Sequence, residues 1–220
     1  TGARKPLIIT GSNAGSEAII EAAANIAKAL KGRGSDVGIT FVAGAANSMG
    51  LAMIGGGSLD QALEQLASGA ADTAIVMEND LYRHAPAAQV DAALAKVNNL
   101  IVADHQRTAI MDKANLILSS ASFAESDGTL INQEGRAQRF FQVYDPAYYD
   151  DAKKNQFTVM LESWRWMHSL HSTYTSRHVD WTQLDDVIAA CVAALPQLQG
   201  IVDAAPDATF RIRGQKLARS

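Results

Sequence analysis

Short apolar runs alternate with longer amphipathic stretches through the first half of the chain. The spacing of apolar residues over 17–30 is helical, Ser58 and Gln61 are spaced as a capping box requires, and Pro86 suits the first turn of a helix that ends near residue 97. This alternation predicts a parallel sheet with helices on both faces, a doubly wound, Rossmann-like α/β fold. The predicted strands are 7–10, 39–43, 73–77, 100–103 and 116–118.

The pattern changes after about residue 144, where Asp145 and Pro146 interrupt it and aromatic residues become frequent. Residues 150–170 and 182–195 have helical patterns, and the second ends before Pro196. We therefore predict a Rossmann-like domain over 1–144 and a helical, aromatic-rich extension with a basic tail over 145–220. Two roles stay open for the aromatic residues, packing on the sheet domain or contact with another protein of a complex. They are Trp164, Trp166, Tyr174 and Trp181, and the basic tail contains Arg211, Arg213, Lys216 and Arg219.

Composition narrows the function classes. A net charge of −4 over 220 residues, 48% of them hydrophobic, indicates a globular protein without the basic surface that attracts nucleic acid. The single cysteine, Cys191, excludes an intrachain disulfide and an iron–sulfur cluster, which needs about four thiolates, and we expect it to be buried. The apolar runs fall short of the ~20 residues that span a bilayer. We expect a cytoplasmic location and, because the chain opens without Met, a fragment of a longer protein.

Small and polar residues follow several predicted strands. The carboxyl ends of parallel strands are where doubly wound sheets bind ligands, so these residues are candidate cofactor contacts. Neither G-x-G-x-x-G nor G-x-x-x-x-G-K-[ST] occurs, and a glycine-rich turn is also the tightest path from strand to helix. Two interpretations, a cofactor contact and a purely structural turn, stay open for these residues. They are Gly11, Ser12, Asn47, Glu78, Asn79 and Asp104.

No local motif indicates catalysis by this chain. There is no G-x-S-x-G elbow and no recognisable set of Ser, His and acid. His168 and His171 lie three residues apart and His178 follows seven later, which permits a zinc site, but no acidic or thiol ligand lies at helical spacing. We therefore predict no catalytic residue and no metal site, and a polar surface or interface role for these histidines.

Residues 119–138 contain two glycine-dependent turns and several charged side chains without helical periodicity. Asp127–Gly128 is a turn dipeptide, which predicts a chain reversal at Gly128 with positive φ. Residues 129–131 are β-prone and predict a short strand. Glycine at 135 predicts a second position where a side chain would be sterically hindered.

The same segment resembles the E-x-x-G-T-x-x-N-x-E-G-R-x-Q motif of the molybdopterin oxidoreductase superfamily. The matching residues are Glu125, Gly128, Thr129, Asn132, Glu134, Gly135, Arg136 and Gln138. The resemblance favours a structural role for them. The stretches AGAANSMG and ENDLYRHAP resemble the branch of this superfamily in the peripheral arm of bacterial respiratory complex I, the proton-pumping NADH-quinone oxidoreductase. Asn115 and Ser119 stand where the superfamily commonly has Asp-x-x-Leu-Pro, which argues against carried-over cofactor contacts.

This resemblance implies a non-catalytic scaffold that has lost the pterin cofactor. It implies no cofactor in this chain, iron–sulfur clusters elsewhere in the parent protein and FMN in the parent complex. The implied partners are other peripheral-arm subunits, with NADH and quinone engaged through the complex on the cytoplasmic side of the bacterial inner membrane. One alternative is a cofactor-binding fragment of an active molybdopterin-dependent oxidoreductase such as a formate dehydrogenase. Another is a free-standing nucleotide-binding module.

Overall fold

The computed structural model describes residues 3–144, 160–175 and 179–204. Several predicted features lie outside these residues: the interruption at Asp145 and Pro146, the first part of the helix expected over 150–170, His178 and the basic tail. The described residues form two compact units. The first contains 3–55, 129–138 and 195–204, and the second contains 56–128, 139–144, 160–175 and 179–194.

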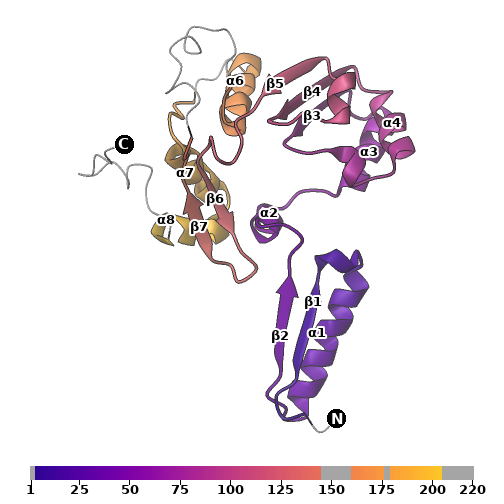
Figure 1. Cartoon of the computed structure of the whole chain (residues 1–220), viewed down its shortest axis with the longest axis vertical. Helices are drawn as coiled ribbons and strands as arrows, with labels where there is room; N and C mark the ends of the chain where they lie inside the picture. Colours follow the sequence, from indigo (N-terminus) through magenta and orange to yellow (C-terminus); the bar gives the residue numbers. More distant parts are fainter. Residues whose placement is uncertain (1–2, 145–159, 176–178, 205–220) are drawn as a thin grey trace, which may run out of the picture. The chain divides into compact units, whose positions relative to one another are not determined.

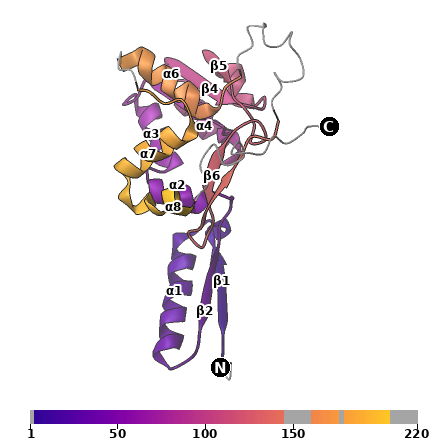
Figure 2. The same cartoon turned by 90° about the vertical axis from the view of Figure 1, so that its left-hand side faces the viewer.

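The first unit contains a pair of parallel strands, β1 (Leu7–Gly11) and β2 (Gly38–Val42), which are joined through α1 (Glu17–Gly32). Figures 1 and 2 both show α1 running alongside this pair. Ala23 and Ala27, one turn apart, are the buried positions of α1, because small side chains allow the helix to approach the strands closely. A 3-10 turn η1 (Ser12–Ala14) follows β1, and the unit also contains α2 (Ser48–Ile54), η4 (Pro196–Leu198) and α8 (Gly200–Ala204).

The second unit is built on three parallel strands in the order β3-β4-β5. They are β3 (Thr73–Met77), β4 (Asn99–Asp104) and β5 (Leu116–Ser119), with α3 (Leu59–Ser68), η2 (Leu81–Arg83), α4 (Ala87–Leu94) and η3 (Ala109–Lys113) before and between them. Leu63, Val90, Val102 and Ile110 are fully buried at the centre of its core. The predicted capping box is confirmed, since the side chains and backbone N–H groups of Ser58 and Gln61 bond reciprocally.

Strands β6 (Gly128–Ile131) and β7 (Ala137–Phe140) form a separate two-stranded sheet, a hairpin whose tip belongs to the first unit and whose base belongs to the second. The second unit ends with α6 (Ser163–Thr175) and α7 (Leu184–Ala194), drawn in orange and yellow in Figure 1. Cys191 on α7 is only half-buried, so the prediction of a buried thiol is wrong. Within the described ranges no helix is both long and apolar enough to cross a bilayer.

The predicted α/β class is confirmed, with parallel strands flanked by helices and a helical C-terminal part. All five predicted strands are present, but they form two parallel sheets instead of one. The chain leaves the first unit through α2, a helix that the pattern did not predict, and enters the second between Gly55 and Gly56. Both glycines have positive φ, 83° and 128°, which a residue with a side chain rarely adopts.

Candidate functional site at the carboxyl ends of the strands

The carboxyl ends of β3 and β4 border a polar hollow of about 330 Å³ in the second unit. Three of the predicted contacts, Glu78, Asn79 and Asp104, line it. This is the position at which parallel α/β sheets bind ligands. The other lining residues are Asp80, Arg83, His84, His105, Gln106, Arg107, Thr108 and Ala109.

Glu78 has an unusual backbone. Its φ of 48° makes it the one residue other than glycine with positive φ in the described part of the chain. Left-handed backbone costs a residue with a Cβ roughly 1–2 kcal/mol. The conformation is held from two sides, because the Glu78 N–H donates to the Ala103 carbonyl over 2.8 Å and the carboxylate accepts a hydrogen bond from the Ser163 hydroxyl.

Asp104 ends β4 and is 7% exposed. Its Oδ1 accepts a hydrogen bond from the Gln106 N–H over 3.0 Å and lies 3.3 Å from His105 Nδ1. Its carbonyl accepts from the Ser120 N–H over 3.1 Å. The carboxylate is therefore engaged by the loop that follows its own strand.

The other three predicted contacts, Gly11, Ser12 and Asn47, lie in the first unit. A Cβ on Gly11 would lie 2.1 Å from the Val42 carbonyl oxygen, so glycine here permits the close approach of β1 and β2. Ser12 Oγ accepts a hydrogen bond from the Gly44 N–H over 3.1 Å. Asn47 Oδ1 accepts one from the Ile131 N–H over 2.8 Å and thereby bonds the tip of the β6–β7 hairpin. These polar atoms make intrachain bonds.

The motif between 125 and 138 forms the entry and the turn of this hairpin. Glu125 Oε2 accepts from both the N–H and the hydroxyl of Ser122, over 2.9 and 2.7 Å. Asn132 Oδ1 accepts from the N–H groups of Glu134 and Arg136, over 3.0 and 2.9 Å, and Gly135 has φ of 78°. The positive φ of Gly135 bears out the predicted relief of a steric limit there, and the predicted strand over 129–131 is confirmed.

The predicted reversal at Gly128 is wrong. Gly128 begins β6 and has no positive φ, and the chain reverses at 132–136. Glycine is needed at 128 because of close packing, since an added Cβ would lie 2.2 Å from the Phe140 ring on β7.

Comparison with known proteins identifies the family of this chain. A family model described as molybdopterin oxidoreductase matches residues 2–155. The chain belongs to the molybdopterin oxidoreductase family. Several curated relatives are similar over the whole chain and are named as the G subunit of NADH-quinone oxidoreductase. The identity is 84% over 100% of the chain for the protein of Yersinia pestis, 70% over 99% for that of Escherichia coli K12, and 57% over 99% for that of Pseudomonas putida. The chain spans about a quarter of the length of these relatives, 24% in each case.

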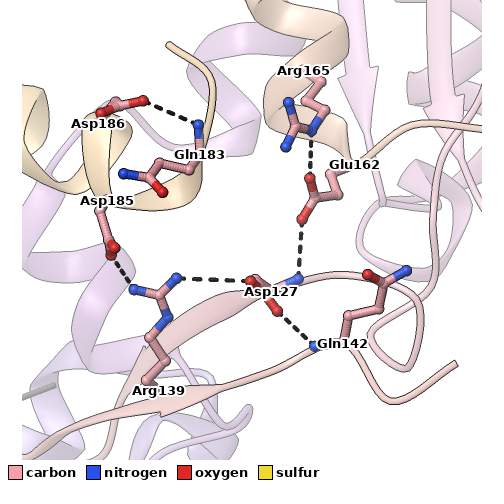
Figure 3. Close-up of polar contacts among 8 residues, drawn as sticks. All are labelled: Asp127, Arg139, Gln142, Glu162, Arg165, Gln183, Asp185 and Asp186. Atoms are coloured by element: carbon pink, nitrogen blue, oxygen red, sulfur yellow. Dashed lines mark hydrogen bonds and ion pairs between the residues drawn. The ribbon is translucent and has the colours of Figure 1, made fainter. Parts of the chain in front are cut away.

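In this member of the molybdopterin oxidoreductase family, the base of the motif hairpin is joined to the C-terminal helices (Figure 3). The Arg139 side chain on β7 is only 1% exposed. It bonds Asp185 in the first turn of α7, lies 3.8 Å from Asp127 Oδ2 and packs with its guanidinium 5.4 Å from the centre of the Phe141 ring. A buried cation thus faces two partly exposed carboxylates.

Asp127 connects the same hairpin to α6. Its backbone N–H donates to Glu162 Oε1 over 3.1 Å, and Glu162 Oε2 accepts from Arg165 Nε over 2.6 Å. Asp127 Oδ1 accepts from the Gln142 N–H over 2.6 Å. Figure 3 shows these side chains converging from the hairpin and from the starts of both helices. Neither Arg139 nor Glu162 belongs to the family motif, and no local pattern indicates that the hairpin meets the helices here.

The described groups with shifted pKa values do not line the polar hollow. Backbone N–H groups of Thr182 and then Gln183 hold the pKa of the Asp186 carboxyl below its usual range. The hydrogen bond from Lys113, followed by that from Tyr82, lowers the pKa of Asp91, and the same Asp91 contact raises the pKa of Lys113. Each shift follows from a hydrogen bond at an exposed position, a pattern that also occurs in ordinary ion pairs.

His168 and His171 both lie on α6, and His168 has intrachain contacts. His168 Nε2 lies 2.6 Å from the Val179 carbonyl oxygen, and its ring centre lies 5.8 Å from that of Trp181. Among the described residues no group of three or more His, Cys, Asp or Glu could hold a metal ion.

Proposed function

We propose that this chain is part of the G subunit of a bacterial proton-pumping NADH-quinone oxidoreductase and forms a non-catalytic α/β body within it. The observation that carries the proposal is the identity of 57–84% to proteins of that name over 99–100% of the chain. Similarity at this level along the whole chain is far more specific than a shared fold, which many functions use.

In this proposal, electrons pass from NADH to quinone through centres that lie outside this chain. Iron–sulfur clusters require about four cysteine ligands and the chain has one cysteine, so the clusters belong to other parts of the parent protein, and FMN belongs to the complex. The chain's contribution is mechanical. Its two compact α/β units help to hold the redox subunits in place.

The proposed partners are other peripheral-arm subunits, and the proposed location is the cytoplasmic side of the inner membrane. Phe123, 80% exposed, lies in the loop before the motif hairpin, and Val143, 69% exposed, is bonded to Ala124 beside it. Aromatic side chains such as Phe123 are enriched at protein interfaces, and the exposed Val143 extends the apolar surface beside it. We expect a neighbouring protein of the complex to cover them.

A second candidate is a fragment of an active molybdopterin-dependent oxidoreductase. The family match and the polar hollow beside Glu78 and Asp104 favour it. The internal bonds of both carboxylates count against it, because a ligand would have to replace them.

The test is purification of the full-length parent protein, tagged and extracted from bacterial membranes with a mild detergent. We expect NADH-driven quinone reduction to co-purify with the tag, and an untagged strain to give none. Recovery of the intact tagged protein with no associated NADH oxidation, from membranes that show it before extraction, would exclude the proposal.

A further inference from the structure

Residues 160–166 of the second unit lie against the ends of its strands. Leu161 forms an isolated parallel bridge with Ser120, directly after β5. Its N–H donates to the Ser119 carbonyl over 3.2 Å, and its carbonyl accepts from the Ala121 N–H over 2.9 Å. These bonds fix the start of α6 beside the carboxyl end of the sheet.

The first turn of α6 then bonds the ends of two strands. The hydroxyl of Ser163, a residue that is 9% exposed, donates to the Glu78 carboxylate just after β3. The Trp166 indole N–H donates to the carbonyl of Ser119, the last residue of β5, over 2.8 Å. Since β4 lies between β3 and β5, one helical turn spans the carboxyl end of the three-stranded sheet.

The family's cofactor can be tested against this arrangement. A molybdopterin dinucleotide carries a pterin, a diphosphate and a nucleoside, and is larger than a drug-sized ligand. The hollow that remains is about 330 Å³, at the low end of the roughly 300–1,000 Å³ found for drug-sized ligands. The carboxylates of Glu78, Asp80 and Asp104 border it beside the guanidinium groups of Arg83 and Arg107, so the lining is of mixed charge and lacks the predominantly cationic surface that favours a diphosphate. The described residues do not fit this cofactor.

We propose that α6 is a built-in occupant of the carboxyl-end crevice of β3, β4 and β5. The Ser163 hydroxyl takes the place on Glu78 that the hydroxyl of a bound ligand would take, and the left-handed backbone of Glu78 is held by this contact. The chain itself thus fills the part of the crevice beside Ser163 and Trp166, and the hollow of about 330 Å³ remains next to it. This inference concerns the second unit alone and does not rest on membership of a respiratory complex.

Hydrogen exchange of the 220-residue chain tests this occupancy. Ser163→Ala removes the contact, and Ser169→Ala removes an exposed hydroxyl from the same helix as a matched control. We expect Ser163→Ala to speed amide exchange in 78–84 and 160–166 about tenfold, as loss of one hydrogen bond to a charged group implies, while the core strand β4 keeps its protection. Ser169→Ala should leave both segments unchanged. Equal exchange in the two variants would overturn the proposal.

Two further measurements keep the test independent of one variant. Trp166→Phe retains an aromatic ring but loses the donor to Ser119, and should speed exchange in 160–166 while leaving 58–68 unchanged. ADP and GDP, used as nucleoside diphosphate probes at millimolar concentration, should leave exchange of 78–84 in the wild-type chain unaltered. Protection of 78–84 by either nucleotide would show an open crevice and overturn the proposal.

Discussion

Gly128 and Gly135 occur in one motif, but each is required for a different physical reason. Gly135 occupies a left-handed turn with open space where a Cβ would be, whereas Gly128 has ordinary strand backbone and faces the Phe140 ring. The destabilisation caused by replacing each glycine should therefore be reduced by a different kind of change.

Replacement of Gly135 tests backbone conformation. Gly135→Ala should lower the free energy of unfolding by about 1–2 kcal/mol, because φ of 78° is costly for a residue with a Cβ. Gly135→Asn should lose clearly less, since asparagine tolerates the left-handed region better. Urea unfolding of both variants measures the difference, and equal losses would contradict a cost set by φ.

Replacement of Gly128 tests close packing. Gly128→Ala places a methyl group against Phe140 and should cost about 1–3 kcal/mol, the usual range for overpacking. In the double variant with Phe140→Leu, a large part of that cost should disappear, which a double-mutant cycle by urea unfolding would detect. Strictly additive effects would show that the ring does not determine the need for glycine.

Asp186 provides a pH-dependent prediction. Its lowered pKa means that the folded state favours the carboxylate, so its contribution to stability is full above the ordinary aspartate pKa and disappears as the pH falls through the lower folded value. Asp186→Asn should therefore reduce the melting temperature at pH 7, and the difference from wild type should shrink progressively on acidification. The control Glu64→Gln removes an exposed carboxylate on α3. A difference that stays constant down to about pH 2, below the ordinary aspartate pKa, would contradict this linkage.

At the scale of elements, the polar cluster at the hairpin base joins β7 to α7 through Arg139. The Arg139 guanidinium is buried, but its Nε and Nη2 make no hydrogen bonds within the described structure, and its partners Asp127 and Asp185 are 26% and 30% exposed. The hydrogen-bonding groups of this cluster are thus only partly satisfied. Its main contribution to stability is that the buried Arg139 charge has partners of opposite charge.

Arg139→Met should lower the free energy of unfolding by about 1–3 kcal/mol, because Asp185 loses a charged hydrogen bond. The matched control is Arg107→Met, which breaks a surface pair with Asp112 whose side chains are 83% and 63% exposed, and should cost at most about 1 kcal/mol. Both values come from chemical unfolding. A smaller loss for the buried pair than for the surface pair would contradict the role of the cluster.

Local patterns predicted most elements, because strands and helices leave periodic signals. Strand 73–77 is placed correctly, and α1 extends two residues beyond its predicted end at residue 30. The short helix α2 was missed, since seven residues before a triple glycine give too little periodicity. The division into two sheets was also missed, because strand pairing depends on contacts between distant residues.

At the candidate site too, local features could be predicted from the sequence and contacts between distant residues could not. The residues after β3 and β4 could be chosen from the sequence, because a strand end is a local feature. The partner of Glu78 is 85 positions away on α6, and nothing in the spacing around either residue signals that contact.

At the scale of the whole molecule, this member of the molybdopterin oxidoreductase family bonds its own side chains at the carboxyl ends of its strands, where doubly wound sheets bind ligands. Glu78 and Asp104 in one unit, and Ser12 and Asn47 in the other, all make intrachain hydrogen bonds. These bonds support the proposed scaffold role, because a cofactor would have to displace them.

The most direct test of this central claim is the molybdenum and pterin content of the purified full-length parent protein, measured per polypeptide by elemental analysis and by fluorescence of the oxidised pterin. We predict that both are far below one per chain in a preparation that oxidises NADH. One molybdenum and a stoichiometric pterin per chain would contradict the claim and would assign the crevice beside Glu78 to a bound cofactor.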